Sequence, residues 1–237
     1  MPSTENLQSA IAWCAPYLAF QPLAIGGPEP ALTIGNVILQ TMLGPPFCWR
    51  FNRATAAPFT CLTDGTQDYS VAISDFGFIE KAWLQDPASG PYRELVYKSP
   101  LARTSEKDRP LHICDQGDDN AGNITFRLMP APDQAYPVSV QYQRKAALML
   151  SLASTWAPIP DEFGYIYKWG FLALAAMLRN DSRFPIFSDK FVSHLLGAQA
   201  GLDEMQRNIF LGNWLEVTRA ALRSDLMTKA AATARTR

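Results

Sequence analysis

The sequence predicts an α+β protein in which a helical bundle carries an inserted antiparallel β domain, built as a small sandwich or an open barrel. Apolar residues recur at helical spacing up to about residue 43, and they alternate with polar residues in short runs between residues 56 and 143. Helical spacing then returns and continues to the C-terminus. We therefore expect residues 1–55 and 144–237 to form the bundle with a C-terminal extension, and residues 56–143 to form the inserted domain.

The N-terminal part predicts two helices. The first has an apolar stripe at Leu7, Ile11, Cys14 and Leu18 and is cut by Pro16. The second is expected over residues 30–43, because one apolar stripe runs along it and Gly44 follows where such a helix commonly ends. That stripe consists of Ile34, Val37, Ile38 and Met42.

The middle of the chain predicts seven short strands bounded by turn residues. They are residues 59–63, 70–74, 79–84, 94–97, 111–114, 124–128 and 138–143. The connections are too short for crossover helices, so we expect every pair to be antiparallel. Residues 99–110 are polar and charged, and we expect a mobile loop there.

The C-terminal part predicts three helical stretches. A short helix is expected over residues 145–154, then a central helix over residues 162–178 capped by Asp161. A last region begins near Ser188, shows a narrow coiled-coil-like seam, and is expected to break at Gly212. Residues 230–237 have no apolar anchor, so we expect no ordered structure there in the isolated chain. The seam consists of Phe191, Leu195, Ala198, Leu202, Met205 and Ile209.

Composition excludes several classes of function. The formal net charge is −1, from 21 basic and 22 acidic residues, so no overall field attracts the chain to nucleic acid or an anionic membrane. The four cysteines lack C-x-x-C spacing and only His112 and His194 are present, so we expect neither a metal site nor a cofactor. The apolar run at residues 163–178 contains Lys168, and no basic residue precedes the apolar N-terminus, so neither a membrane span nor a signal peptide is expected.

The usual signatures of enzymes are missing, so we do not expect an enzyme. The triplet at residues 75–77 is Asp-Phe-Gly, but no glycine-rich loop or catalytic loop of a kinase accompanies it. A hydrolase without a local motif stays open as an alternative, with His112, Asp115 and Asp118 as its candidates. A second alternative is a tail-tip or receptor-binding module whose β domain binds carbohydrate. Its candidate residues are Trp83, Tyr92 and Tyr97.

Two groups of residues are candidate interaction sites. The first is an aromatic and polar group expected to join the β insert to the bundle: Trp49, Phe51, Asn52, Gln67, Asp68 and Tyr69. The second is the C-terminal helix with its tail, where basic residues outnumber acidic ones and would be ordered by a neighbouring copy or a partner. It consists of Trp214, Arg219, Arg223, Lys229, Arg235 and Arg237.

Three segments together resemble the head-to-tail adaptor proteins of short-tailed bacteriophages, also called connector or tail tubular protein A-like proteins. The segments are Trp-Arg-Phe-Asn at residues 49–52, Thr-Asp-Gly-Thr-Gln-Asp-Tyr at residues 63–69, and Pro-x-Pro at residues 158–160. In that family a helical bundle carries an inserted β domain. The resemblance covers most of the chain.

The resemblance implies a virion protein of the neck or tail, made in the host cytoplasm, that forms a homo-oligomeric ring of usually twelve copies. The ring would bind the portal protein on one side and the tail nozzle, or tubular protein, on the other. Genomic double-stranded DNA would pass through its lumen during ejection without specific binding, and no membrane would be involved. A near-neutral chain suits such a conduit, because a strongly basic lumen would retain the phosphate backbone.

Overall fold

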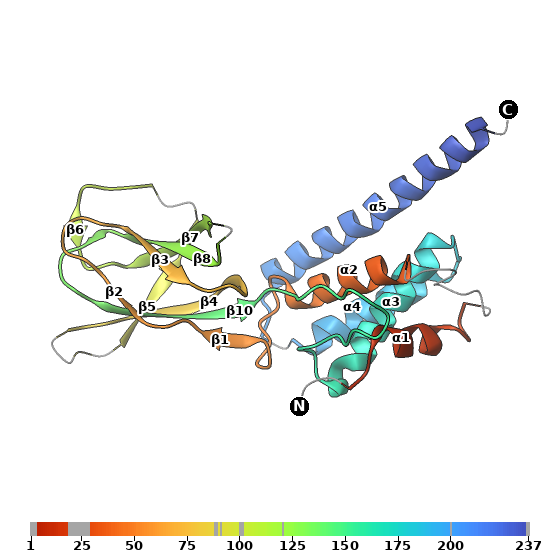
Figure 1. The fold of residues 1–237 in the computed structure, drawn as a ribbon, viewed down its shortest axis with the longest axis horizontal. Helices are drawn as coiled ribbons and strands as arrows, with labels where there is room; N and C mark the ends of the chain where they lie inside the picture. The colour runs from red at the N-terminus through yellow and green to blue at the C-terminus, as the bar shows by residue number, and fades with distance from the viewer. Residues whose placement is uncertain are drawn as a thin grey trace. The chain divides into compact units, whose positions relative to one another are not determined.

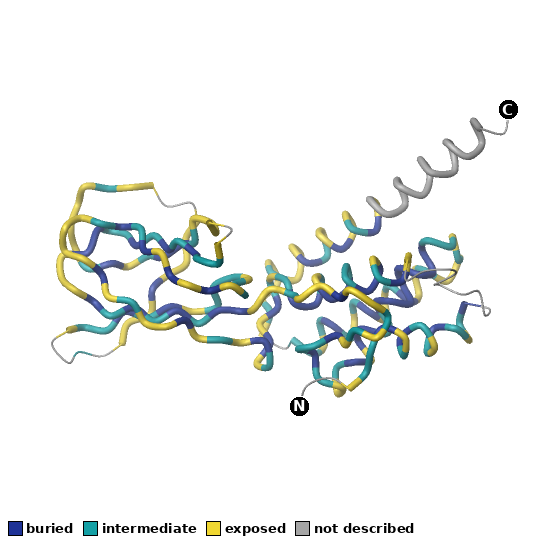
Figure 2. Tube along the Cα trace, in the orientation of Figure 1, coloured by how far each residue is buried: buried dark blue, intermediate teal, exposed yellow. Residues whose placement is uncertain are grey.

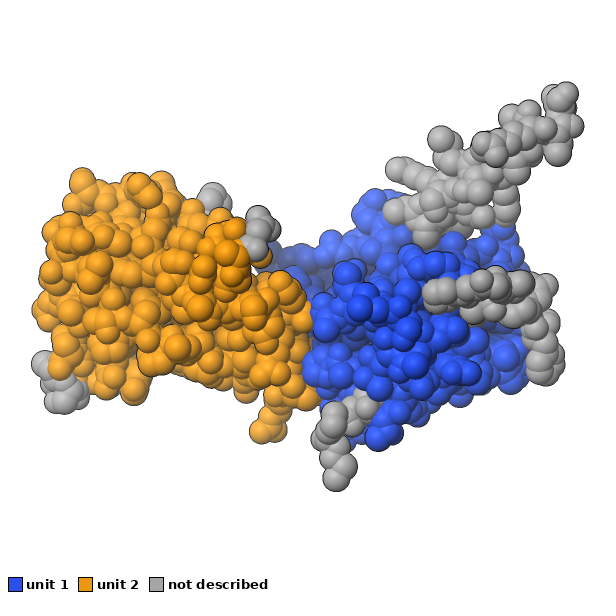
Figure 3. All heavy atoms as spheres, viewed as in Figure 1, with its two compact units in different colours: residues 1–47, 146–237 blue, residues 48–145 orange. Residues whose placement is uncertain are grey.

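The computed structural model describes residues 4–18, 29–87, 90, 92–99, 102–119, 121–199 and 201–235, with side chains up to residue 219. The chain is α+β, with five α-helices and a curled, mostly antiparallel sheet in the part described (Figure 1). It divides into two compact units, which Figure 3 colours separately. Unit 1 consists of residues 1–47 and 146–237, and unit 2 of residues 48–145.

Unit 1 is helical. Its elements are α1 (Leu7–Cys14), α2 (Ala31–Leu43), the 3₁₀ turn η1 (Asp161–Phe163), α3 (Gly164–Leu178), α4 (Phe184–Gly197) and α5 (Glu204–Arg235). The helices α1, α2, α4 and α5 all contact α3. Helices far apart in the sequence therefore share one core.

The central helix α3 is apolar on almost every side and is buried over most of its length (Figure 2). Its Tyr167 ring stacks on Trp156 with ring centroids 4.5 Å apart, and both side chains are fully buried. Gly170 allows α4 to approach closely, because a Cβ atom there would lie 2.8 Å from the Phe191 ring. On the same helix, the Lys168 ammonium forms an ion pair with Glu5 at 2.6 Å, which fastens the N-terminal segment to α3.

Both N-terminal helices were predicted, and the stripe on α2 is confirmed, with Ile34, Ile38 and Met42 buried. The predicted cap at Asp161 is wrong, because η1 precedes α3 and the Asp161 carboxylate accepts hydrogen bonds from Thr4 instead.

The predicted helix over residues 145–154 is also wrong. Residues 145–150 form no helix and run along α2 (Figure 1), where Asn36 binds the backbone of Met149, and residues 151–154 form a turn. A side-chain amide in this position replaces the hydrogen bonds that a helix would have supplied to the backbone.

The predicted long seam is wrong as well, because the chain leaves the helical conformation between α4 and α5. Phe191 and Leu195 are buried on α4, whereas Met205 and Ile209 on α5 are 72% and 47% exposed. Conversely, α5 continues through Gly212 without a break and extends to Arg235. The expected interruption is therefore wrong, and residues 230–235, expected to lack ordered structure, belong to α5, while residues 236–237 lie outside the described residues.

Unit 2 contains all ten described strands. They are β1 (Arg53–Thr55), β2 (Phe59–Thr60), β3 (Asp68–Ala72), β4 (Phe76–Gln85), β5 (Tyr92–Tyr97), β6 (Lys107–Asp108), β7 (His112–Asp118), β8 (Asn123–Met129), β9 (Ala131–Pro132) and β10 (Pro137–Arg144). The seven predicted strands are present as β2, β3, β4, β5, β7, β8 and β10. Three very short strands, β1, β6 and β9, were not predicted.

The main sheet has the order β1-β10-β4-β5-β7-β8-β3, and β2 also pairs with β10. The sheet curls so that Phe59 on β2 stacks on Tyr69 of β3, with ring centroids 5.4 Å apart. Alternate residues of β8 and β10 face the interior (Figure 2), where Phe126, Leu128 and Val138 are completely buried. The result is a half-barrel with an aromatic and aliphatic core.

Two strand pairs are parallel, which corrects the prediction of a purely antiparallel domain. Strand β5 pairs in parallel with β7, and β6 with β9. A parallel pair needs a connection long enough to return to the same end of the sheet. Residues 98–111 supply that connection between β5 and β7, and the described part of this range contains the short strand β6 and no helix.

Candidate interaction site

Among the described residues, unit 1 forms an apolar groove with a volume of about 690 Å³. We call it the apolar groove. Helices α2, α3 and α5 and the turn after α2 form its walls, and no lining residue is charged. The lining residues are Thr33, Ile34, Val37, Gln40, Thr41, Gly44, Pro45, Leu174, Met177, Leu178, Phe210, Asn213, Trp214 and Val217.

The α5 wall of the groove is held by aromatic contacts. The Phe210 ring meets Phe47 edge-on, with centroids 4.9 Å apart, and Trp214 lies against Phe191 at 4.8 Å. The Trp214 indole nitrogen also donates a hydrogen bond of 2.9 Å to the Ser188 hydroxyl. Because a buried aromatic ring with a satisfied polar atom has little freedom, the groove is preformed in the single chain.

Among the residues predicted for portal or neighbour contact, Trp214 is 3% exposed and lines the groove. Arg219 lies at the surface of α5 and pairs with Glu216 one turn earlier, at 2.9 Å. Arg223, Lys229 and Arg235 belong to the helical backbone of α5, and Arg237 lies outside the described residues. The role of this group as a contact site stays a prediction.

The six residues predicted for the junction all belong to unit 2, where the structure gives them two different sets of partners. The first three lie where the chain enters this unit. Trp49 and Phe51 stack with centroids 5.1 Å apart, and the Asn52 amide donates to the Arg144 carbonyl at 2.8 Å. They therefore clamp the incoming chain to the end of β10, where the chain also leaves the unit.

Two of the other three, Gln67 and Asp68, fasten the connection that follows β5. The Gln67 amide donates to the Thr104 carbonyl at 2.9 Å, and Asp68 accepts hydrogen bonds from Arg127 and Arg103. Hydrogen bonds from Arg127, assisted by Arg103, lower the pKa of the Asp68 carboxyl. Within the expected mobile loop at residues 99–110, Arg103 and Thr104 are therefore tied to Asp68 of β3 and to Gln67 just before it.

The Tyr69 hydroxyl has a local structural role. It donates to the Thr66 carbonyl at 2.7 Å and receives a hydrogen bond from the Leu62 amide at 3.2 Å. Burial raises the pKa of this phenol to about 12, so it stays protonated and keeps donating at neutral pH. The turn that leads into β3 is closed by this residue, and the junction role of all six residues stays a prediction.

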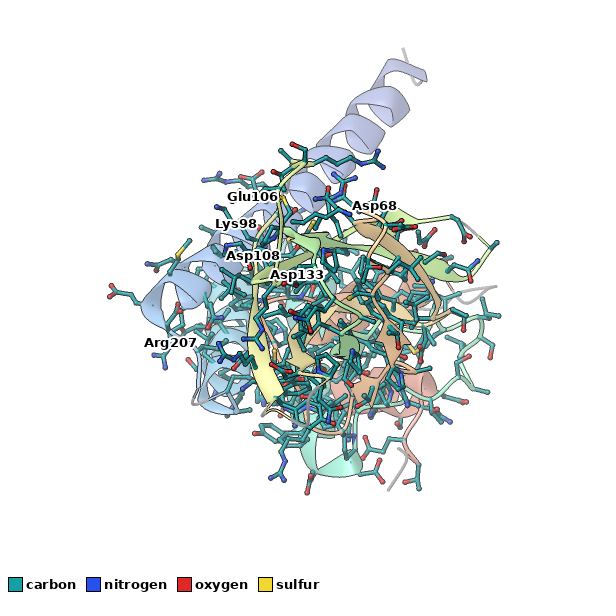
Figure 4. The ribbon with its side chains drawn as sticks, turned by 90° about the vertical axis from the view of Figure 1, so that its left-hand side faces the viewer. Asp68, Lys98, Glu106, Asp108, Asp133 and Arg207 are labelled. Carbon is teal, nitrogen blue, oxygen red and sulfur yellow. The ribbon has the colours of Figure 1, made fainter. Side chains whose placement is uncertain are left out.

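Charged residues of unit 2 also gather around the short strands β6 and β9 (Figure 4). Asp108 is paired in register with Pro132 of β9, and the adjacent Asp133 accepts a hydrogen bond of 2.8 Å from the Tyr136 hydroxyl. Burial, and then this hydrogen bond, raise the pKa of Tyr136 to about 12. These contacts stabilise the turn between β9 and β10.

The residues named for a hydrolase do not converge on a catalytic arrangement. Asp115 accepts a hydrogen bond of 3.0 Å from the Tyr97 hydroxyl, while Asp118 is exposed at the end of β7. Among the residues whose placement is described, no three His, Cys, Asp or Glu side chains could hold a metal ion together. Of the proposed carbohydrate-binding aromatics, Tyr92 and Tyr97 are 62% and 51% exposed, and Trp83 is only partly exposed.

The described residues thus offer a preformed groove without charged lining residues in unit 1, and charged residues that stabilise the loops of unit 2. The family model of the SU10 adaptor protein matches residues 47–223, and the chain belongs to this family. It is a bacteriophage adaptor-type structural protein and a virion component that interacts with other virion proteins. No curated protein matches the chain. No helix in the described part of the chain is long and apolar enough to cross a bilayer.

Sequence reasoning missed the groove as a site. Ile34, Leu174 and Phe210 each read as ordinary core positions of a helix, because an apolar stripe has the same spacing whether it faces a core or a partner. A signal was nevertheless present. Phe210 and Trp214 lie one turn apart on α5, which is much more polar than α3. Two large aromatic residues at this spacing give a polar helix one local apolar face.

Proposed function

We propose that this protein is the head-to-tail adaptor of a short-tailed phage, in which copies form a ring, of about twelve, between the portal and the tail nozzle. Double-stranded DNA passes through the lumen without being bound. The observation that carries this proposal is the family match over residues 47–223, which spans the whole β unit together with α3, α4 and the packed part of α5.

In this proposal the two compact units are two domains with separate tasks. The helical unit offers an uncharged groove and a long C-terminal helix, which suit contacts with neighbouring copies and with the portal. Basic side chains along the C-terminal part of α5 can form ion pairs with an acidic partner surface. These residues are Arg219, Arg223, Lys229, Arg235 and Arg237.

We place the β unit on the nozzle side, and its exposed apolar residues support a surface that a partner covers. Val96 and Leu111 are 60% and 56% exposed near the one parallel junction of the main sheet, beside exposed Tyr97. Exposed apolar residues that cluster on a rigid sheet are typical of a surface that a partner covers.

Truncation of the last helix tests the portal contact. Removing residues 223–237 should leave a folded chain, because Phe210, Trp214 and Thr218, the buried residues among the described side chains of α5, all precede the cut. We expect the truncated chain to be missing from purified portal complexes.

A full-length variant without the basic side chains shows whether portal binding depends on their charge or on the length of the helix. Replacing Arg223, Lys229, Arg235 and Arg237 by glutamine keeps the helix and removes its basic side chains, so a charge-driven contact is weakened and becomes less sensitive to salt. Normal incorporation of the truncated chain into particles, or electron micrographs of particles with no ring of this protein at the neck, would overturn the proposal.

A further inference from the structure

Unit 1 exposes an apolar segment in addition to the apolar groove. We call residues 146–154, Ala-Ala-Leu-Met-Leu-Ser-Leu-Ala-Ser, the apolar strap, and it contains no charged residue. Its middle is extended, so successive side chains point to opposite sides. Met149 is 3% exposed, whereas Leu148 and Leu150 on either side are 55% and 84% exposed. The strap therefore presents two leucines outward from one buried anchor.

The backbone of the strap is fixed on the helical unit. The Asn36 side chain accepts a hydrogen bond of 2.7 Å from the Met149 amide and donates one of 3.1 Å to the Met149 carbonyl. The Ser154 hydroxyl accepts hydrogen bonds from the amides of Leu150 and Ser151. Because Met149 between the two leucines is bound to Asn36, and Leu152 after them accepts a hydrogen bond from the Gln8 amide, the two leucines are ordered before any partner arrives, which lowers the entropy cost of binding.

The groove and the strap have matching chemistry but do not meet within one chain. None of the strap residues lines the groove, and the lining contains no charged side chain among the described residues. A volume of about 690 Å³ falls within the range of clefts that enclose a drug-sized molecule, so two leucine side chains fit. Docking the strap would desolvate no charge on either side.

We propose that Leu148 and Leu150 of one copy occupy the apolar groove of the neighbouring copy. This inference rests on the proposed ring, and it specifies which two surfaces join the copies. An interface between two different surfaces of the same chain is heterologous, and repeated heterologous contacts close into a ring when the rotation between copies allows it. Each chain then contributes one filled groove and one inserted strap.

Cysteine cross-linking between two differently tagged populations tests the contact. In a Cys48→Ser background, which removes the exposed thiol, one population carries Leu150→Cys and the other carries Gln40→Cys at the exposed rim of the groove. Both are incorporated into the same particles and oxidised. We expect a disulfide-linked dimer that carries both tags, which only contact between copies can produce.

The matched control replaces Leu150→Cys by Ile186→Cys on α4, which is 58% exposed and does not line the groove. This pair should give no linked dimer. A ring seen in micrographs without a link between Leu150→Cys and Gln40→Cys overturns the strap contact and leaves the ring intact. A link from Gln40→Cys to a different virion protein also overturns it, and particles without any ring overturn both proposals.

Truncation of the leucines gives a second measurement. The double variant Leu148→Ala and Leu150→Ala removes exposed side chains, so the isolated chain should fold normally. We expect its self-association to weaken at least about tenfold, as expected for the central apolar residues of an interface. The Ile186→Ala variant should assemble as the unchanged chain does. Equal assembly of the double variant and the unchanged chain would contradict the proposal.

Discussion

Two glycines in the middle of helices should respond to alanine with opposite signs. Gly170 lies in α3, where an added Cβ atom would be 2.8 Å from two carbons of the Phe191 ring and 3.0 Å from the Ile38 Cδ1 atom. Phe191 and Ile38 are both completely buried, so neither can move aside freely. Gly212 lies in α5, is exposed, and has no atom within 4 Å of the same position. Comparing Gly170→Ala with Gly212→Ala therefore isolates the free-energy cost of overpacking the core at Gly170.

The magnitudes follow from two opposing effects. Alanine is favoured over glycine in a helix interior by about 0.8–1.0 kcal/mol, and this gain applies at both positions. Overpacking of a filled core costs about 1–3 kcal/mol and applies only at Gly170. We expect Gly212→Ala to stabilise the helical unit by about 1 kcal/mol and Gly170→Ala to destabilise it by up to about 2 kcal/mol.

Urea unfolding followed by circular dichroism at 222 nm measures both free energies, because the helices of unit 1 dominate that signal. The comparison is made between the two variants, so the helix-propensity gain cancels and a difference of about 1–3 kcal/mol remains. If Gly170→Ala stabilises the unit as much as Gly212→Ala does, the close approach of α3 and α4 at this glycine is not real.

Three further predictions concern the strap, the β unit and the thiols. Asn36→Ala removes both hydrogen bonds to the Met149 backbone and should lower the free energy of unfolding by about 1–3 kcal/mol, measured by urea, with Gln40→Ala on the same helix as the unaffected control. The pKa of Asp68 is lowered by Arg127, so its contribution to stability is present above the unfolded pKa of about 4 and is lost as the pH falls through the folded value. Asp68→Asn should therefore lose less stability than the unchanged chain between pH 5 and pH 3 in thermal melts, and equal losses would show that the ion pair is not formed. A thiol reagent should label only Cys48 in the native chain and all four cysteines after denaturation, because the other three are buried; rapid native labelling of a second thiol would refute that burial.

The elements that local sequence patterns specify could be predicted, and the ones that depend on distant partners could not. Seven strands and the helix α2 were predicted because alternation, turn residues and helical stripes are local signals. The strap was predicted as a helix because Leu148 and Leu152 have helical spacing. Its extended conformation depends on Asn36, which lies over a hundred residues earlier in the sequence and is not visible in any local pattern.

The break between α4 and α5 could have been predicted. Asp203 accepts a hydrogen bond of 2.7 Å from the Gln206 amide, and the Gln206 side chain accepts one of 3.1 Å from the Asp203 amide. This reciprocal pair is a capping box, and the spacing of Asp and Gln that produces it is visible in the sequence. The seam interpretation prevailed because apolar residues continue on both sides of the break, which shows that capping residues should outweigh a weak periodicity.

The interaction surfaces were harder to predict because core and interface use the same residue types. Phe210 and Trp214 on α5 contact Phe47 and Phe191 in the folded chain, and the same two side chains also line an open groove. The spacing of apolar residues indicates that this face of α5 is buried. It does not indicate whether the face is buried entirely by the same chain or partly by a partner. Only the three-dimensional arrangement of α2, α3 and α5 separates the part that is filled from the part that is open. In an assembling protein, an uncharged preformed groove beside a fixed apolar strap is therefore a stronger indication of the contact between copies than the basic C-terminal residues, whose charge also suits an ordinary helix end.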